Sequence, residues 1–318
     1  MKILIAGATG AMGRPLVRML VQRGHDVVGL TRTAEKRSLL ESMGAGASVG
    51  DALDAERINK VVADVAPTHL VHLLTALPPA GPLRARDLRA TNALRIQGTA
   101  NLVRAAIGAG VKRLVAESFI GVYGAANFDR PHGEDGPLPP PPDGPFHDTV
   151  LALRSMEDQL AQARDAKDLE TVTLRFGGIY GPDVPSSSAL LRLLRAGRVF
   201  LPRGANGVMS FIHVDDAAEA TIAALEHPAP AAVYNIVDDE PMPIAKLIEL
   251  TASTFGTPPP RTAPAWLIRL IAPIMAAAAS SRVPLSNANA KRELGWHPRY
   301  PNTREGLRSM ASQIGHAA

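Results

Sequence analysis

Short β-forming runs alternate with helical segments along the first half of the chain. Residues 2–8 (KILIAGA) form an apolar run typical of a buried strand, and residues 10–24 follow with the spacing of a helix that ends at Gly24. Because right-handed βαβ connections place consecutive strands parallel in one sheet, this alternation predicts an α/β fold with a doubly wound parallel sheet. The expected strands are 2–8, 25–32, 47–51, 68–74, 111–118 and the first part of 170–181, and the expected helices are 10–24, 39–45, 58–67, 92–110 and 148–165.

The composition limits the classes of function. The 318 residues, of which 46% are hydrophobic, suffice for one large domain or two unequal lobes. Lys and Arg (34) barely exceed Asp and Glu (30) and form no basic block, so we expect no nucleic-acid partner. Cysteine is absent, which excludes disulfides and thiolate chemistry and fits a reducing cytoplasm. The N-terminus enters a strand at once and no apolar run is long enough to span a membrane, so we expect neither a signal peptide nor a span.

A glycine-rich turn follows the first strand. The stretch GATGAMG places Gly7, Gly10 and Gly13 between that strand and the start of a helix. Glycine allows a tight turn and close approach of the backbone to a pyrophosphate, and a helix N-terminus offers free N–H groups and a positive dipole end. The sequence therefore predicts a dinucleotide-binding loop.

Five further segments share a pattern with the GxxGxxG loop. They are VGDALD, VHLLTA, LRFGGIYGP, FIHVDDAA and RELGWHPRYP, and together they resemble the extended short-chain dehydrogenase/reductase family, also described as NAD-dependent epimerase/dehydratase-like, over nearly the whole chain. The resemblance implies a Rossmann-type sheet with a smaller C-terminal substrate lobe. We expect residues 1–180 to form mainly the dinucleotide-binding domain, with a lid-like loop at 125–147, and 181–318 mainly the substrate lobe, with 208–237 returning to the Rossmann core.

The resemblance also implies a set of cofactor contacts. Asp51, after the third strand, would bond the adenine. The expected cofactor-binding residues are Gly7, Thr9, Gly10, Ala11, Met12, Gly13, Arg32, Asp51, Ala52, Leu73, Leu74, Thr75, Phe176 and Gly178.

The end of the second strand bears on the choice between NAD(H) and NADP(H). An acidic residue there would hold a ribose 2′-hydroxyl. The chain instead has Thr31, Arg32 and Thr33, with Lys36 beyond. A guanidinium suits a 2′-phosphate by charge and by geometry, so we predict NADP(H) rather than NAD(H), with a surface arginine as the alternative reading.

The catalytic positions depart from the family pattern. In the family a Ser or Thr polarises the substrate carbonyl, a Tyr transfers a proton, and a Lys lowers the pKa of the Tyr and binds ribose. Alignment on VYG puts Phe119 at the hydroxyl position, and alignment on Glu157 puts Thr149 and Leu153 at the Tyr and Lys positions. No YxxxK occurs elsewhere in the chain. The standard proton relay is therefore excluded.

A replacement proton donor has several candidates. We rank Ser118, Tyr123 and His147 as catalytic candidates without a preference among them. Ser118 neighbours the usual hydroxyl position, but adjacent strand residues point to opposite faces. His147 has a side chain that titrates near neutral pH. Glu134 and Asp135 on the lid and Tyr180 after the sixth strand are further options, and Tyr123 and Tyr180 also have a structural reading.

The substrate end also differs from sugar-nucleotide members of the family. Met209 stands where such members carry an arginine for the diphosphate, with Arg203 nearby, and Arg95 stands in place of the Asn of NxxGT, one turn after Asn92. Residues 265–279 (AWLIRLIAPIMAAAA) add apolar surface, read either as core or dimer contact or as pocket lining. In the pocket they would favour a substrate more hydrophobic than a nucleotide sugar.

These features leave three hypotheses of function. The first is an NADP(H)-dependent oxidoreductase acting on a small, partly apolar carbonyl or alcohol with a non-standard proton donor. The second is a non-catalytic NADP(H)-binding regulatory or scaffold protein, and the third is a non-redox isomerase or lyase. No metal-ligand cluster with plausible spacing occurs, so we expect no metal. The resemblance further implies a homodimer that pairs through the helices containing Ala93–Ala109 and Thr149–Arg164.

Overall fold

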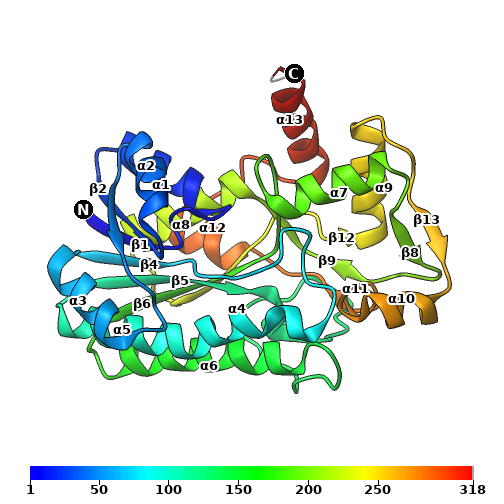
Figure 1. Cartoon of the computed structure of the whole chain (residues 1–318). Coiled ribbons are helices and arrows are strands. Elements are labelled where there is room, and N and C mark those ends of the chain that lie inside the picture. Colours follow the sequence, from blue (N-terminus) through cyan, green and yellow to red (C-terminus); the bar gives the residue numbers. More distant parts are fainter. Residues whose placement is uncertain (317–318) are drawn as a thin grey trace.

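A seven-stranded parallel sheet runs through the larger part of the molecule (Figure 1). The computed structural model describes residues 1–316, and its main sheet has the strand order β11-β6-β5-β4-β1-β2-β3. This order confirms the predicted doubly wound Rossmann-type fold. The strands of this sheet are β1 (Lys2–Ala6), β2 (Asp26–Thr31), β3 (Gly46–Val49), β4 (His69–His72), β5 (Arg113–Phe119), β6 (Glu170–Phe176) and β11 (Val233–Ile236).

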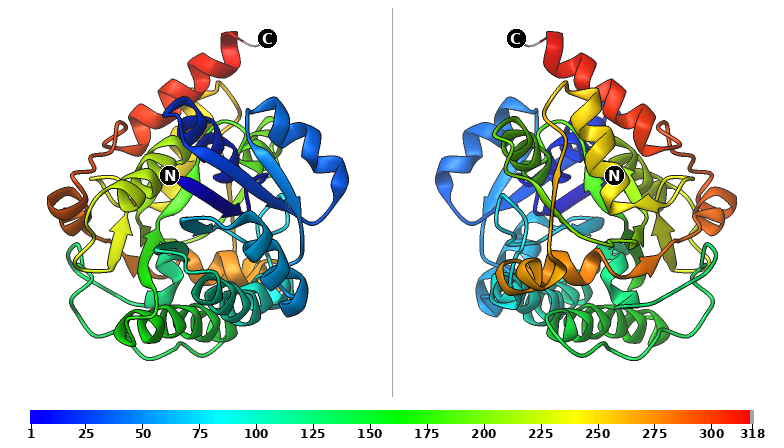
Figure 2. Two further views of the ribbon diagram at one scale, coloured as in Figure 1. Left: turned by 90° about the vertical axis from the view of Figure 1, so that its left-hand side faces the viewer. Right: turned by 90° about the vertical axis from the view of Figure 1, so that its right-hand side faces the viewer.

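Helices cover both faces of the sheet and bury its apolar side chains (Figures 1 and 2). One core cluster lies between the sheet and α1, α2, α8 and α12, and a second lies between the sheet and α3, α5 and α6. A strand buried on both faces needs apolar residues at every position, which explains runs such as KILIA. The bounds are α1 (Gly13–Gln22), α2 (Arg37–Ser42), α3 (Ala55–Val65), α4 (Arg89–Ala93), α5 (Thr99–Gly108), α6 (His147–Asp165), α8 (Val214–Glu226) and α12 (Ala288–Leu294).

The predicted long helix over 92–110 is interrupted. The chain forms α4, then a π-helical segment at Leu94–Gly98, then α5. A π-helical turn inserts one extra residue per turn, is rare, and often occurs at functional sites. Its second residue is Arg95, the position at which the sequence departs from the family's Asn.

A smaller lobe occupies the C-terminal side of the sheet (Figure 1). It contains two- and three-stranded sheets and its own apolar cluster around Tyr180, Phe211 and Ile248. β11 and α8 return to the main sheet and to α1; the exact domain division stays a prediction. The remaining elements are β7 (Gly178–Tyr180), α7 (Pro185–Arg195), β8 (Phe200–Pro202), β9 (Val208–Met209), β10 (Phe211–His213), β12 (Met242–Pro243), α9 (Ile244–Thr254), β13 (Arg261–Ala263), α10 (Ala265–Ile271), α11 (Pro273–Ala278), β14 (Arg282–Val283) and α13 (Thr303–His316).

The segment between β5 and α6 contains no long helix or strand. It is tied to the small lobe by backbone hydrogen bonds, from the N–H of Phe128 to the carbonyl of Arg282 (2.9 Å) and from the N–H of Arg282 to the carbonyl of Ala126 (3.1 Å). The segment therefore joins the two lobes. Within residues 1–316, no helix combines the length and the apolar character that crossing a membrane requires.

Candidate cofactor and active site

The glycine loop has the geometry that a dinucleotide needs. Gly7 has φ +100°, and a Cβ added there would lie 2.5 Å from the carbonyl oxygen of Leu73. A Cβ at Gly13 would lie 2.2 Å from the carbonyl oxygen of Gly7, so both positions require glycine for the turn itself. At Gly10 the only neighbour within 4 Å is that same carbonyl, at 3.1 Å, so this position leaves room for a ligand. The N-cap residue of α1, Met12, makes no side-chain cap. These features fit a pyrophosphate at the helix start.

The carboxyl ends of β1, β4 and β5 bring three residues into one row. Ala6 pairs with His72, and His72 pairs with Ala116, so the next row of the sheet holds Gly7, Leu73 and Glu117. Ligands of open α/β sheets bind at the carboxyl ends of strands where the strand order reverses, here between β1 and β4. Glu117 is thus placed in line with the glycine loop at the mouth of the sheet.

The other predicted cofactor residues lie around the same edge. Arg32 follows β2 and is exposed, and the carboxylate of Asp51 accepts a hydrogen bond from the N–H of Leu53 (3.0 Å). Ala52 is buried, and its carbonyl accepts a hydrogen bond from the side chain of Asn101 (2.9 Å). Their contacts to a cofactor stay predictions. Thr9, Ala11 and Met12 lie in the β1–α1 loop, Leu74 and Thr75 follow β4, Phe176 ends β6 and Gly178 begins β7.

Apolar side chains occupy two of the positions at which the sequence predicts the family's proton relay. Phe119, at the end of β5, packs against the buried cluster that contains Leu153 of α6. Thr149 is 5% exposed, and its hydroxyl accepts a hydrogen bond from the side-chain amide of Asn92 (3.3 Å). A phenyl ring and an isobutyl group neither donate nor accept protons. Phe119 and Leu153 are therefore close together and neither can transfer a proton, while their assignment to the family's relay positions stays a prediction.

Ser118 and Tyr123 are both engaged in a buried polar network. The hydroxyl of Ser118 donates to the carboxylate of Glu157 (2.6 Å), which also pairs with the guanidinium of Arg175 (2.6 Å). The hydroxyl of Tyr123 donates to Asn235 (3.0 Å) and accepts from Arg175 (2.9 Å). Burial raises the pKa of Tyr123. Both hydroxyls are buried, and each makes its hydrogen bonds inside the protein. This arrangement favours the structural reading.

The remaining candidates belong to the lid and to the lobe boundary. His147 begins α6, and its Nδ1 lies 3.2 Å from the carbonyl oxygen of Pro142. Glu134 accepts hydrogen bonds from the N–H of Asn235 on β11 (2.6 Å) and from the side chain of Asn289 on α12 (2.8 Å), which fastens the lid to the main sheet and its covering helix. Asp135 follows it on the lid. Tyr180 is buried in the small lobe's cluster. None of these contacts tests a catalytic role, which stays a prediction for His147.

Two charged side chains, Arg95 and Glu117, lie near the positions predicted for the family's proton relay. Arg95 is 7% exposed, and its guanidinium lies 3.5 Å from the side-chain oxygen of Asn92, the residue that contacts Thr149. Glu117 is partly exposed at the mouth of the sheet and forms no ion pair within residues 1–316. Loss of hydration raises the pKa of Glu117 to about 7, although the charge of Arg95 acts in the opposite direction. Glu117 can thus hold a proton near neutral pH.

His72 lies on β4 behind this pair. Its Nδ1 accepts a hydrogen bond from the N–H of Leu74 (3.2 Å), so Nε2 carries the proton and donates to the hydroxyl of Thr99 (3.1 Å). Burial and the nearby Arg95 lower the pKa of His72 to about 4. The imidazole is therefore neutral and adds no charge to the site.

Sequence reasoning passed over Glu117 and gave Arg95 no role. A signal for both was present, because RLVAESF places an acid directly after the apolar run LVA of a central strand, and RIQGT places an arginine on a helix that packs against the sheet. Charged residues are almost never buried without a partner or a function. Glu117 and Arg95 are therefore two further candidates for the site, and their roles stay predictions.

Known proteins resemble this chain in sequence and in fold. A family model matches residues 3–237. The chain belongs to the NAD dependent epimerase/dehydratase family. A 3-diazoavenalumate denitrifying reductase from Streptomyces sp. is 40% identical over 313 residues, 96% of this chain and 99% of the relative. A 2-alkyl-3-oxoalkanoate reductase from Stenotrophomonas maltophilia is 29% identical, covering 81% of this chain and 77% of the relative. The structure of the Thermus thermophilus UDP-glucose 4-epimerase in complex with NAD has a TM-score of 0.81 at 23% identity, with 100% of both chains covered.

Membership of the epimerase/dehydratase family confirms the resemblance read from the sequence. Relatives of this chain are named reductases and epimerases, which agrees with the prediction of an oxidoreductase enzyme that depends on a nicotinamide dinucleotide. The solved structures share its fold.

Proposed function

We propose that the chain is an NADP(H)-dependent reductase that acts on an elongated, partly apolar electrophile, and that a diazo compound is the favoured substrate class. The observation that carries this proposal is the contact of Phe119 with the Leu153 cluster, where a carbonyl reductase of the family would hold its proton relay. Support comes from the 40% identical relative, which is named for a diazo substrate.

The chemistry of a diazo group suits a site without the Tyr–Lys pair. Carbonyl reduction places negative charge on one oxygen, which must be stabilised and protonated at once. When bound, the reduced nicotinamide supplies a hydride, and with one proton a diazo carbon R₂C=N₂ becomes R₂CH₂ and N₂ while NADPH becomes NADP⁺. The charge develops on the diazo N₂ group, which leaves as neutral N₂ gas. The site therefore does not have to stabilise an oxyanion. Glu117 holds the one proton that is needed, and Arg95 balances the carboxylate left behind.

A ketone or aldehyde substrate is the second candidate. The 29% identical relative is named for a 3-oxoalkanoate, and the small-carbonyl reading of the sequence agrees with it. In this case Glu117 would protonate the developing oxyanion directly. Arg95 would provide the positive charge that the family obtains from its lysine.

One experiment separates these hypotheses. Purified protein is titrated with NADPH and NADH by nicotinamide fluorescence, and then mixed with a diazo ester, ketones, aldehydes and quinones. NADPH oxidation with release of ¹⁵N₂ from the labelled diazo ester is the expected result. Oxidation by ketones alone selects the second candidate. If NADPH binds tightly but no substrate of the panel is turned over, the regulatory and non-redox hypotheses are favoured. If neither nucleotide binds, the cofactor assignment is contradicted.

Arg32 is expected to select NADP(H). In the Arg32→Ala variant, the Kd for NADPH should rise about tenfold, while the Kd for NADH should stay unchanged, because only the 2′-phosphate pairs with the guanidinium. The measurement is the same fluorescence titration at low and moderate salt, and the difference between nucleotides should shrink as salt rises. Arg104→Ala, an exposed arginine on α5, is the matched control. Equal losses for both nucleotides would place Arg32 outside the 2′-phosphate site.

We also propose that the protein is a cytoplasmic homodimer. Support for the dimer comes from three apolar side chains exposed on the helices that the sequence indicated, Ile96, Ile107 and Leu151. Covering them in a pair of α5–α6 surfaces would remove apolar area from water. The cytoplasmic location rests on the absence of cysteine from the sequence.

A further inference from the structure

Two adjoining cavities lie against the helices α10 and α11, and the larger one also faces the lid. The larger, of about 450 Å³, is lined by Ala125, Ala126, Asn127, Pro145, Arg269, Pro273, Ala276, Ala277, Ser280 and Ser281. The smaller, of about 100 Å³, extends from it toward β8 and shares Arg269, Ala276 and Ser280. The larger volume falls within the range of small-molecule sites. Ala126 in its wall belongs to the buried cluster against which Phe119 packs, so the cavity lies next to the cluster at the end of β5.

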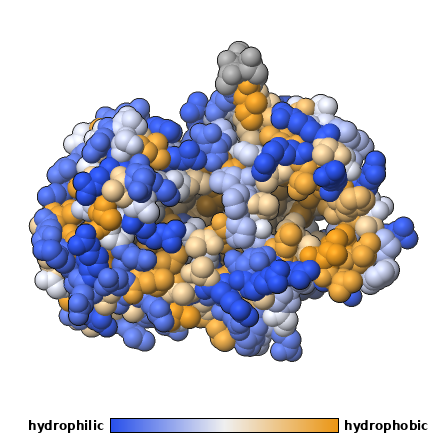
Figure 3. Space-filling view, in the orientation of Figure 1, coloured by the Kyte–Doolittle hydropathy of each residue, from blue (hydrophilic) through white to orange (hydrophobic). Residues whose placement is uncertain are grey.

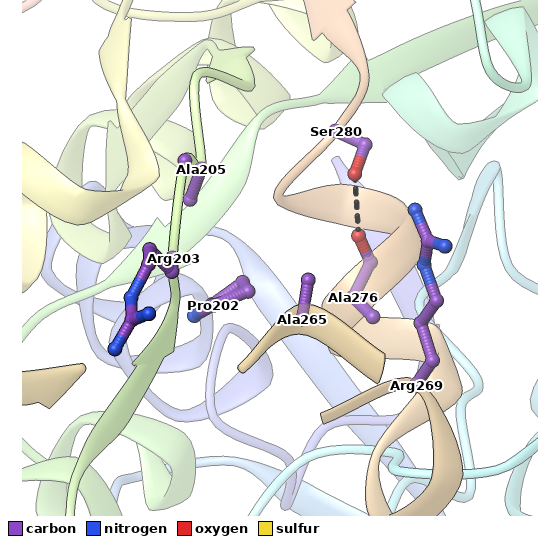
Figure 4. Close-up of a pocket in the computed structure, with 8 residues that line it drawn as sticks. Pro202, Arg203, Ala205, Ala265, Arg269, Ala276 and Ser280 are labelled. Carbon is purple, nitrogen blue, oxygen red and sulfur yellow. Dashed lines mark hydrogen bonds between the residues drawn. The ribbon is translucent and has the colours of Figure 1, made fainter. Parts of the chain in front are cut away.

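The walls of the cavities are fixed by backbone contacts. The lid side is held by hydrogen bonds between Ala126, Phe128 and Arg282. The α11 side is held by the N–H of Gly207 bonding the carbonyl of Ala279 (2.8 Å) and the N–H of Val208 bonding that of Ser281 (2.9 Å). The hydroxyl of Ser280 bonds the carbonyl of Ala276 (3.0 Å; Figure 4). These bonds leave the cavity preformed, which lowers the cost of ordering a ligand there.

The charge of the cavities has one sign. Arg269 and Arg203 are the only charged side chains among the described residues that line them. Figure 4 shows the Arg269 side chain running beside α11 toward Ser280, with Arg203 on the opposite strand. Arg269 forms no ion pair within residues 1–316. The other lining residues are mostly Ala and Pro, so an apolar wall lies beside the exposed, unpaired guanidinium of Arg269, which lines both cavities. Figure 3 shows apolar residues gathered over the α10–α11 part of this face.

We infer that this cavity binds the acidic end of an elongated, apolar carboxylate substrate, with Arg269 pairing its carboxylate. The inference rests on the proposed reductase function and names its substrate class. Both reductase relatives carry the names of carboxylates, a 3-diazoavenalumate and a 2-alkyl-3-oxoalkanoate. An arginine presents two parallel N–H donors to a carboxylate, and a wall of small apolar residues accepts a flat or extended carbon chain.

The test measures binding and needs no turnover. Protein saturated with NADP⁺ is titrated by calorimetry with trans-cinnamate, its methyl ester and UDP. We expect cinnamate to bind about tenfold more tightly than the ester, and the Arg269→Met variant to lose that difference while binding the ester unchanged. Arg308→Met, an exposed arginine on α13, should behave like the unmodified protein. Ala277→Leu, which narrows the cavity but keeps the charge, should weaken both cinnamate and its ester.

Three results would overturn the inference. They are equal affinity for acid and ester, an unchanged preference for the acid in Arg269→Met, and absence of saturable cinnamate binding at millimolar concentration. UDP binding that displaces cinnamate and depends on Arg203 would assign the cavity to a diphosphate instead. Because these readouts do not involve hydride transfer, a protein that binds cinnamate through Arg269 but oxidises no NADPH would retain the carboxylate site and lose the reductase function. If the reductase oxidises NADPH with a carboxylate-bearing substrate and its KM is unaffected by Arg269→Met, the reductase function is retained and the carboxylate site is lost.

Discussion

Replacing Glu117 by glutamine should lower turnover by roughly 10²- to 10⁴-fold with little change in the Kd for NADPH, because the change removes the proton donor but keeps the shape of the side chain. Glutamine can donate a hydrogen bond from its amide, but it cannot release a proton. The measurement is kcat for whichever substrate of the panel oxidises NADPH, with cofactor affinity measured separately by fluorescence.

The pH profile distinguishes this role from a structural one. Glu117 must be protonated to act, so kcat of the unmodified protein should fall as the pH rises through about 7. Burial raises this pKa, and the charge of Arg95 on the π-helical segment acts in the opposite direction. The residual rate of Glu117→Gln should lack that limb. A profile that stays the same in the variant would remove Glu117 from the reaction.

Stability supplies an independent readout for Glu117. Its pKa is raised in the folded protein from the model-compound value of 4.5 to about 7, so between those values the folded state holds more protons than the unfolded state. The free energy of unfolding should therefore decrease as the pH rises through this window, and Glu117→Gln should remove that decrease. The variant is then more stable than the unmodified protein above pH 7 while being less active. If Glu117 served packing alone, Glu117→Gln would lower the free energy of unfolding and leave kcat unchanged.

The sheet could be predicted from sequence because its determinants are local. Apolar runs such as KILIA and DVVGLT indicate buried strands, and the glycine loop indicates the tight turn from β1 into α1. The interruption of 92–110 could not be predicted, because a π-helical turn has the same local preferences as an α-helix. It is stabilised by packing of the segment against α6, which periodicity does not encode.

The site was only half predictable for a related reason. The absence of the relay at Phe119, Thr149 and Leu153 follows from alignment, but its replacement depends on which side chains meet in space. For Ser118, the structure adds a hydrogen bond from its hydroxyl to Glu157 (2.6 Å) that the sequence does not show, and its catalytic role stays a prediction. Glu117 and Arg95 lie 22 residues apart on different elements, and only the register of β1, β4 and β5 brings the acid into line with the glycine loop.

Tyr123 and Arg175 allow the structural reading of the buried network to be tested. Tyr123→Phe should lower the free energy of unfolding by about 1–2 kcal/mol, because the bonds to Asn235 and Arg175 are lost. Arg175→Met should cost more, about 3–5 kcal/mol, because it leaves the carboxylate of Glu157 buried without its ion-pair partner. Urea denaturation measures both.

Turnover then decides between the two roles of Tyr123. If the network is structural, Tyr123→Phe keeps kcat within about twofold, since no proton passes through the phenol. Tyr234→Phe is the matched control, because it removes a buried phenol that donates to Glu293 (2.9 Å) at the far edge of the sheet. A loss of 10²-fold or more in Tyr123→Phe alone, with folding intact, would make Tyr123 the proton donor in place of Glu117.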